Sequence, residues 1–311
     1  MTAFFLIVAL VLVLLLCGLY GIYRYVFYSP ARRRQATVDT ADGVILENDG
    51  DATKERIRYL YDLPHERVTI RSFDGLTLSA RIYAGDADKP VDICCHGYRG
   101  SALRDMSGGA TVLLEQRHTL ILIDERAHMH SEGHSISFGI NERRDLYEWV
   151  RYAVDRYGSD VRINLVGISL GGATVLMTAS MPLPENVRTI CADCPYNAPK
   201  DIIIYVAERL KLPAHLLYPL IAFSGFLFGG FWLSEMTAAR AVKDTDIPIL
   251  IIHGDADTLV PAYMSEQVRI ANVKRVERHT FPEAEHGLSF IRDEKRYRRL
   301  LIGFLRRHDA L

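Results

Sequence analysis

Short apolar runs of strand length alternate with helical patterns along most of this 311-residue chain, and this alternation restricts the fold more than any other feature. The strand-like runs cover residues 91–95, 119–124, 163–166, 189–192, 247–252 and 275–281. Between them, stretches such as residues 140–158 place apolar side chains at helical spacing. Strands that alternate with helices predict an α/β fold with a mostly parallel central sheet and helices on both faces.

The segments before residue 91 predict a hairpin and a linker. Residues 67–84 alternate between apolar and polar side chains on both sides of Asp74 and Gly75, which is typical of a β-hairpin. We therefore expect antiparallel strands at one edge of the sheet. Residues 28–64 are polar and rich in charge, and we interpret them as a linker with one helix around residues 51–63. The main domain is then expected over residues 65–311.

The N-terminal segment from Thr2 to Tyr23 carries no charged side chain. As a helix it would be about 33 Å long, which is enough to cross the core of a bilayer. A cleaved signal peptide is the alternative, but it normally has basic residues before its apolar core, and here none precede it. A lipoprotein signal at Cys17 is disfavoured because Leu16 stands where a small residue is expected. We expect an uncleaved, single-pass transmembrane anchor over residues 1–27.

The charges that flank this anchor predict its orientation. No Lys or Arg stands on its N-terminal side, whereas Arg24, Arg32, Arg33 and Arg34 follow it. Positively charged flanks resist translocation, so the bias predicts an outside N-terminus and a main domain on the cytoplasmic side.

A serine stands between a strand and a helix at residue 169. The apolar run from Val161 to Val166 stops at Gly167, and a helix of small residues begins soon after Ser169 and Gly171. Ser169 could be a plain N-cap, since serine is common at that position. The alternative is a nucleophile elbow, in which flanking glycines allow a sharp turn that exposes the hydroxyl. That hypothesis requires an acid and a histidine later in the chain.

Both groups follow in the required order. Asp255 and Asp257 come directly after the strand-like run 247–252, and His286 follows the run 275–281. Because the carboxyl ends of parallel strands meet at one edge of a sheet, we expect an aspartate, His286 and Ser169 to converge there. The order serine, aspartate, histidine differs from the orders of chymotrypsin-like and subtilisin-like enzymes.

From about residue 67 to its end, the chain resembles the α/β-hydrolase superfamily, most closely the branch with serine aminopeptidase-like and esterase/lipase-like members. The matching stretches are "CCHGYRGS", "IDERAHMHSEGHS", "VGISLGGATVL", "IIHGDADTLVP" and "EAEHG". The resemblance implies that Asp257 is the acid. Asp255 is a second candidate that more plausibly shapes the turn, and Asp193, at the end of another strand, is a third.

The chemistry assigns a role to each of these residues. His286 would accept the proton of Ser169 during attack, and Asp257 would orient the imidazole. The backbone N–H of Leu170, next to the serine, would stabilise the oxyanion. By resemblance, the second donor is the backbone N–H of Tyr98.

Other histidines and the cysteines offer competing interpretations. His128, His130 and His134 could suggest a metal site, but no distant set of ligands is apparent. His96 and His253 precede glycines at strand ends, and we expect them to bond loop backbone. The pair Cys191 and Cys194 has the spacing of a redox motif or half a zinc site. Without a second such pair, we expect buried free cysteines, no metal and no cofactor.

Residues 196–240 are longer than an ordinary connection and mostly apolar. Within them, residues 216–233 carry no charge and approach the length of a second transmembrane span. One crossing there would place the later strands on the opposite side of the membrane from the earlier ones. We therefore expect a helical cap insertion between the sixth and seventh strands that covers an apolar substrate cleft and could also touch the bilayer.

The sequence thus predicts a membrane-anchored serine hydrolase, a carboxylesterase or a lipase-like acyl hydrolase with a small-molecule or lipid-like ester substrate. The alternatives are a serine peptidase or aminopeptidase-like amide hydrolase, a metallohydrolase, and a non-catalytic binding protein of the same fold. Lys and Arg total 37 against 38 Asp and Glu, so nothing indicates a general nucleic-acid binder.

Overall fold

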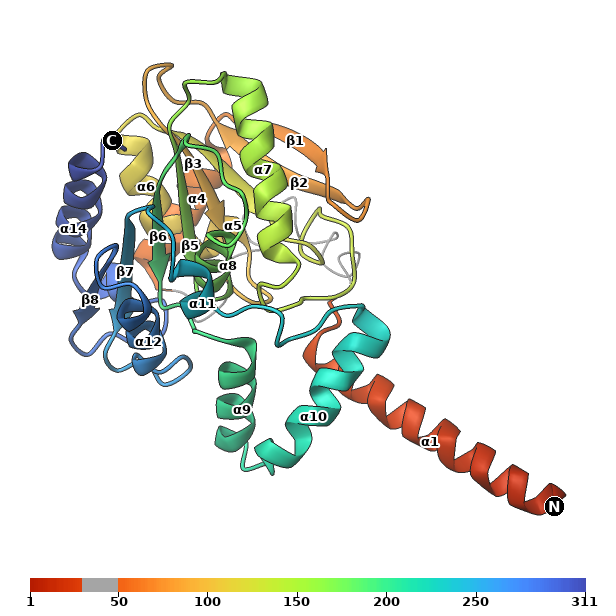
Figure 1. Cartoon of the computed structure of the whole chain (residues 1–311). Coiled ribbons are helices and arrows are strands. Elements are labelled where there is room, and N and C mark those ends of the chain that lie inside the picture. The colour runs from red at the N-terminus through yellow and green to blue at the C-terminus, as the bar shows by residue number, and fades with distance from the viewer. Residues whose placement is uncertain (30–49) are drawn as a thin grey trace.

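One mixed, 8-stranded sheet forms the centre of the computed structural model, which describes residues 1–29 and 50–311 (Figure 1). The strands are β1 (Glu66–Arg71), β2 (Thr77–Tyr83), β3 (Val91–Cys95), β4 (Thr119–Asp124), β5 (Ile163–Ile168), β6 (Val187–Asp193), β7 (Ile249–Gly254) and β8 (Val276–Phe281). Their order across the sheet is β1-β2-β4-β3-β5-β6-β7-β8. The expected hairpin is confirmed, because β1 pairs antiparallel with β2 at the edge. The strand β2 is antiparallel to β4, and the pairs from β4 to β8 are parallel.

Helices cover both faces of the sheet. One face packs against α7 (Glu142–Tyr157), α8 (Leu170–Thr178), α11 (Ala238–Val242) and α12 (Tyr263–Ala271), and the other against α4 (Asp51–Asp62), α5 (Ala102–Asp105), α6 (Ser107–Glu115), α13 (Ser289–Arg292) and α14 (Glu294–Arg307). Each face of the sheet has its own apolar core, and successive side chains of β3 point to opposite faces. Ile93 and Cys95 lie in the core under α7 and α8, and Cys94 lies in the core under α5 and α6. All three are fully buried, as expected for a parallel strand covered on both sides.

The helix α4 changes the expected boundary of the domain. It lies where the sequence predicted a helix, but Ile57 and Leu60 are fully buried in the core beside α5 and α6 rather than part of a linker. The expected linker over residues 28–64 is therefore wrong for its last part. The misassignment arose because α4 is polar on most of its surface and buries only a narrow apolar stripe. Residues 30–49 of that linker lie outside the described residues.

The N-terminal helix α1 (Thr2–Val26) has an exposed part and a buried base. Of the described helices, only α1 is long and apolar enough to cross a membrane. Its first residues project away from the domain, whereas Tyr23 and the following Phe27 are buried in the core (Figure 1). The ring of Phe27 packs edge-on against Phe138 and Phe231, at centroid distances of 5.8 and 5.3 Å.

Hydrogen bonds also attach this base to the domain. The Tyr23 hydroxyl lies 2.6 Å from Ser135 Oγ, and the backbone N–H of Ser29 donates to the carbonyl of His134. The backbone N–H of Ile136 donates in turn to the carbonyl of Phe27. The base of α1 is therefore attached to the domain both by ring packing and by hydrogen bonds.

The variant Phe27→Ala should lose about 3 to 5 kcal/mol of unfolding free energy, because it leaves an aromatic-sized cavity in the core. Denaturant unfolding of the full chain in detergent micelles measures the loss. The exposed Phe5 provides the matched control, and Phe5→Ala should change the unfolding free energy by less than about 0.5 kcal/mol. Equal unfolding midpoints for the two variants would show that the base of α1 is not part of the stable core.

Between β6 and β7 the chain forms the expected helical insertion. It contains α9 (Pro199–Arg209), α10 (Ala214–Ser224), the π-helical turn η2 (Gly225–Gly229) and α11. The apolar side of α10 and η2 packs against α1, and the Phe228 ring contacts those of Tyr20 and Tyr23 at 5.2 and 5.7 Å. The sequence had placed the apolar residues of this insertion over the substrate cleft, whereas one side of α10 and η2 lies against the N-terminal helix and the other is exposed.

Candidate active site

Ser169 occupies a strained turn between β5 and α8. Its φ of 57° and ψ of −115° lie in a region that side-chain-bearing residues rarely adopt. A Cβ on Gly167 would stand 2.2 Å from the carbonyl oxygen of Gly171, and one on Gly171 would stand 2.2 Å from that of Cys95. The two flanking glycines are therefore required by close backbone approach. The Ser169 side chain makes no capping hydrogen bond to α8, so the plain N-cap interpretation does not hold.

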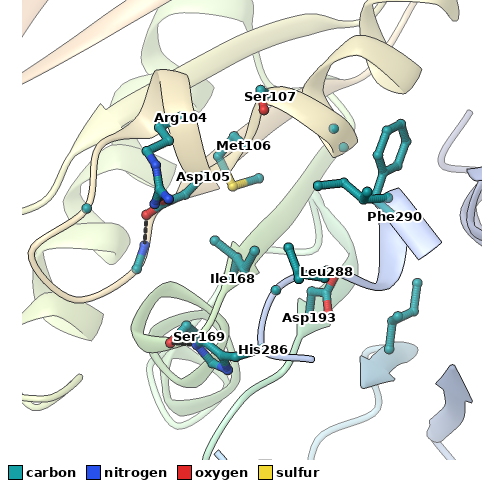
Figure 2. A pocket seen from close by; sticks show the side chains of 18 of the residues that line it. Arg104, Asp105, Met106, Ser107, Ile168, Ser169, Asp193, His286, Leu288 and Phe290 are labelled. Carbon is teal, nitrogen blue, oxygen red and sulfur yellow. Dashed lines mark hydrogen bonds and ion pairs between the residues drawn. The ribbon is translucent and has the colours of Figure 1, made fainter. Parts of the chain in front are cut away.

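The structure brings Ser169, His286 and Asp257 together at the carboxyl edge of the sheet. His286 Nε2 lies 2.9 Å from Ser169 Oγ, and His286 Nδ1 lies 2.7 Å from Asp257 Oδ2. Figure 2 shows the Ser169 hydroxyl and the His286 ring facing each other. With Nδ1–H donating to the carboxylate, Nε2 is available to accept the serine proton.

The surroundings of Asp257 favour a carboxylate. Burial by itself would raise its pKa, but hydrogen bonds from His253 and His286 outweigh that effect and hold the pKa below its usual range. Its Oδ1 also accepts the backbone N–H groups of Leu259 and Val260, at 2.9 and 2.8 Å. Asp255 is exposed and accepts the backbone N–H of Glu283 at 2.6 Å, so it holds the turn as expected.

Asp193, the third candidate acid, supports the serine through its backbone rather than its carboxylate. Its carbonyl accepts the backbone N–H of Ser169 at 2.8 Å. The carboxyl group is buried, and one of its oxygens has no partner. Burial raises the pKa of Asp193 to about 6, although nearby His253 and a hydrogen bond from Tyr297 oppose the rise.

This raised pKa predicts a pH-dependent cost in stability. The unfolded pKa is about 3.9, so between roughly pH 4 and pH 6 the folded protein binds more protons than the unfolded chain, and stability falls as pH rises through that window. The variant Asp193→Asn cannot ionise. Its unfolding free energy relative to the wild type should therefore increase by up to about 3 kcal/mol between pH 4 and pH 7. Denaturant unfolding at several pH values tests this, and parallel pH profiles for the two proteins would contradict it.

The loop after β3 carries Tyr98 and lies against the serine. Its backbone is fixed at two points: the Gly97 N–H donates to Asp105 Oδ2 at 2.9 Å, and the Arg99 N–H donates to His128 Nε2 at 3.0 Å. This loop lines the same pocket as Ser169. Leu170, the other expected donor, begins α8 directly after the serine, and the N-terminus of that helix supplies its backbone N–H.

The same loop is bonded to the base of α1. The Tyr98 hydroxyl donates to the carbonyl of Val26 at 2.7 Å. The Arg99 guanidinium donates to the carbonyls of Tyr25 and Tyr28, at 2.8 and 3.3 Å. The last turn of the N-terminal helix thus presents its carbonyl groups to the loop that is expected to hold the oxyanion.

His96 and His253 bond loop backbone, as the sequence predicted. His96 Nδ1 donates to the carbonyl of Gly97 at 2.8 Å, while its Nε2 accepts the backbone N–H of Glu125 at 3.1 Å. His253 Nε2 donates to the carbonyl of Val260 at 2.8 Å. These contacts hold the turns that carry Tyr98 and Asp257.

The three histidines of the loop after β4 have separate partners. His128 bonds Arg99, His130 Nδ1 lies 3.4 Å from an Asp124 oxygen, and the His134 ring stacks on Tyr28 at 5.7 Å. They do not form a shared set of ligands.

A tighter group consists of His96, Glu125 and His128, whose donor atoms lie within 4.8 Å of one another. In this arrangement the Nε2 atom of each histidine already accepts a backbone N–H, and each Nδ1 donates to a carbonyl. All four ring nitrogens therefore hydrogen-bond loop backbone and leave no lone pair for a metal in this arrangement.

Cys191 and Cys194 are buried free thiols. Cys194 Sγ lies 3.9 Å from His286 Nε2, a proximity that the sequence did not indicate. Burial raises the pKa of the Cys194 thiol well above its usual value, so the group stays protonated beside the imidazole.

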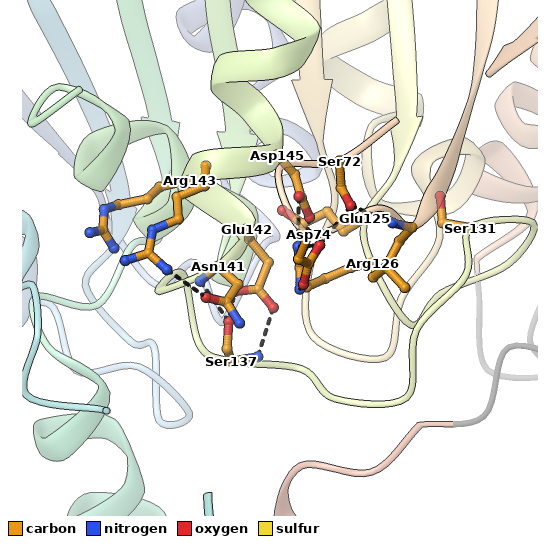
Figure 3. A network of polar contacts seen from close by, with 12 residues as sticks. Ser72, Asp74, Glu125, Arg126, Ser131, Ser137, Asn141, Glu142, Arg143 and Asp145 are labelled. Atoms are coloured by element: carbon orange, nitrogen blue, oxygen red, sulfur yellow. Dashed lines mark hydrogen bonds and ion pairs between the residues drawn. The ribbon is translucent and has the colours of Figure 1, made fainter. Parts of the chain in front are cut away.

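A polar network holds the loop that follows β4 (Figure 3). The buried Arg126 guanidinium bonds Asp145 of α7 at 2.6 and 2.7 Å, and Asp74 of the hairpin turn at 3.0 and 3.1 Å. Farther along the loop, Glu142 accepts the Ser137 hydroxyl and backbone N–H. These contacts fix the segment that carries His128, and with it the backbone around Tyr98.

A cavity of about 510 Å³ opens beside Ser169 and His286. Its walls are largely apolar, and Met106, Ile168, Leu288 and Phe290 lie around it in Figure 2. None of its lining residues comes from residues 196–240, so the expectation that the insertion covers the cleft is wrong for this cavity. The helices α4, α5, α6, α13 and α14 bound it instead, on the opposite side of the sheet from α8.

Two supporting residues were not found from the sequence. Asp105 fixes Gly97, and His128 fixes Arg99, but each acts through a contact between distant loops. No spacing in the sequence marks such pairs. The aromatic residues between Tyr23 and Tyr28 could have indicated that the base of α1 packs into the domain. However, aromatic residues at the end of an apolar helix also suit a membrane interface.

The comparisons with known proteins agree with this architecture. Residues 91–212 match the family model described as alpha/beta hydrolase fold. The esterase Pf2001 of Pyrococcus furiosus superposes with a TM-score of 0.66 at 23% identity, over 85% of this chain and 96% of that one. The protein has the α/β-hydrolase fold.

Relatives found by sequence have similarly low identity. The chain is 26% identical to YqkD of Bacillus subtilis (strain 168) over 216 residues, which are 68% of this chain and 70% of that protein. It is also 26% identical to the serine hydrolase BPHL of Mus musculus over 230 residues, or 67% of this chain and 77% of that protein.

Proposed function

We propose that this protein is a membrane-anchored serine hydrolase that cleaves carboxylic esters. The observation that carries the proposal is the hydrogen-bonded series from Ser169 through His286 to Asp257, with the serine held at positive φ. The esterase and serine hydrolase names of similar proteins support the same class. The apolar cavity beside the serine suits an acyl group.

The proposed reaction proceeds through an acyl-enzyme. Ser169 Oγ attacks the ester carbonyl carbon while His286 Nε2 takes the hydroxyl proton. The tetrahedral intermediate collapses, the C–O bond to the alcohol breaks, and His286 returns the proton to the leaving alkoxide. Water then attacks the acyl-serine with His286 as base again, which releases the carboxylic acid and restores the hydroxyl. Throughout, Asp257 holds the Nδ1–H tautomer and stabilises the imidazolium.

The oxyanion of each tetrahedral intermediate would be held by the backbone N–H groups of Leu170 and Tyr98. Both are main-chain donors on fixed elements, one at the start of α8 and one in the loop bonded to Asp105 and His128. Preorganised donors of this kind stabilise the transition state by roughly 3 to 4 kcal/mol each.

The proposal is tested by labelling the full chain in detergent with a fluorophosphonate probe and by profiling it against matched esters, thioesters and peptides. Labelling with ester turnover supports the proposal. Labelling with turnover of peptides alone would assign the same machinery to amide hydrolysis. A folded protein that neither labels nor turns over any substrate would indicate a binding protein of this fold.

We place α1 in a membrane, with the domain on the cytoplasmic side. The exposed, uncharged part of α1 supports the anchor, and Arg24 at its domain end supports the orientation. Arg32, Arg33 and Arg34, which strengthen the bias, lie outside the described residues. C-terminal fusions to a reporter active only outside and to one fluorescent only inside should give internal fluorescence alone. Activity of the outside reporter without internal fluorescence would reverse the orientation.

A further inference from the structure

The insertion between β6 and β7 exposes a run of large apolar side chains. Six of them are between 40% and 73% exposed: Leu216, Leu220, Phe223, Phe226, Leu227 and Trp232. Between Lys211 and Glu235 the sequence contains no carboxylate, lysine or arginine, and His215 is the only titratable group besides a tyrosine. Contiguous apolar surface of this kind on a soluble protein marks a contact with a partner or a membrane.

This surface, which we call the apolar insertion face, continues the surface of α1. The opposite side of α10 and η2 is occupied, since Ile221 and Gly225 are buried and Phe228 contacts the rings of α1. In Figure 1, α10 lies beside the base of α1, and both project from the same end of the domain. A bilayer that surrounds the exposed part of α1 is therefore the nearest apolar phase to the insertion face.

The chemistry of the face fits a lipid interface better than a substrate lid. The cavity beside Ser169 takes no lining residue from the insertion, so these side chains do not enclose it. Trp232 stacks on Phe226 at a ring distance of 4.0 Å and is about half exposed. Tryptophan is enriched at the level of lipid headgroups, where its ring is apolar and its N–H remains solvated.

We propose that residues 212–233 seat the insertion on the bilayer interface beside α1, with the insertion face buried at the boundary between headgroups and acyl chains. This inference rests on the membrane anchor proposed above. The insertion leaves the sheet at the carboxyl end of β6, the edge where Ser169 also lies. The catalytic edge thus faces the membrane, and the substrates that reach it most directly are amphiphilic esters resident in the bilayer.

The two tryptophans of the chain make a direct test possible. Trp149 is fully buried in the core, whereas Trp232 stands on the insertion face. The full chain is reconstituted into phosphatidylcholine vesicles with either ordinary or dibrominated acyl chains, since bromine quenches indole emission on contact. Vesicle flotation measures anchoring separately. We expect dibrominated lipid to reduce the emission of the wild type and to leave that of Trp232→Phe, which retains only Trp149, nearly unchanged.

The double variant Leu220→Glu with Phe223→Glu distinguishes contact of the insertion face with lipid from attachment through α1 alone. It should float with the vesicles through α1 but lose the quenching of Trp232. Wild-type protein that floats without bromine quenching would contradict the proposed contact of the insertion face with the bilayer, but not the anchor. Undiminished quenching in the double variant would overturn that contact as well, since the signal would then come from tethering alone. Protein that fails to float would contradict both the anchor and the seating.

Discussion

Replacing Ser169 with alanine should lower ester turnover by roughly 10⁴- to 10⁶-fold, because no other group can form the acyl-enzyme. Fluorophosphonate labelling should disappear together with activity. The fold should persist, since among the described residues the hydroxyl bonds His286 alone and makes no capping contact with α8. Initial rates on a short-chain ester, measured with active-site-titrated wild type as reference, give the ratio.

The control for this variant is Ser180→Ala. Ser180 lies just beyond the other end of α8, is exposed, and bonds only the carbonyl of Met177. It should keep wild-type turnover and labelling. If Ser169→Ala remained labelled or active at the level of this control, the nucleophile would have to be sought elsewhere.

The second large effect is expected at the acid. Asp257→Asn should reduce turnover by roughly 10³- to 10⁴-fold, because an amide in place of the carboxylate favours the wrong imidazole tautomer and does not stabilise the imidazolium. The pKa of Asp257 is held low by hydrogen bonds from His253 and His286 despite burial, so the group is a carboxylate at neutral pH. Parallel kinetics and circular dichroism separate a catalytic loss from unfolding.

Asp255→Asn is the matched variant two positions away. This carboxylate is exposed and holds only the turn at Glu283, so its loss should change turnover by a few-fold at most. The reverse ranking, with both variants folded, would transfer the role of the acid to Asp255.

The sheet could be predicted closely from the sequence because the information is local. Runs such as residues 91–95 and 119–124 match β3 and β4 to the residue, since a buried parallel strand is mostly apolar and ends where polar turns begin. The turn at Ser169 could also be predicted from the sequence, because the close backbone approach at Gly167 and Gly171 requires glycine at both positions.

The parts that could not be predicted depend on contacts between distant segments. The helix α4 looked like part of a linker because only Ile57 and Leu60 reach the core fully. The apolar insertion was assigned to the substrate cleft because composition shows that a surface is apolar but not what covers it. In the structure, Phe228 packs on α1, and the cavity beside Ser169 is bounded by helices from the other face of the sheet.

If α1 anchors the domain in a membrane as proposed, the bonds from Tyr98 and Arg99 to its last carbonyls have a consequence for release of the domain by proteolysis. Here, a cut after Phe27 would take away the carbonyls of Tyr25 and Val26 that accept from the loop at Tyr98, together with the Phe27 ring from the core. Such a cut would act as inactivation, and an active form released from the membrane would have to retain the chain from Tyr23 onward.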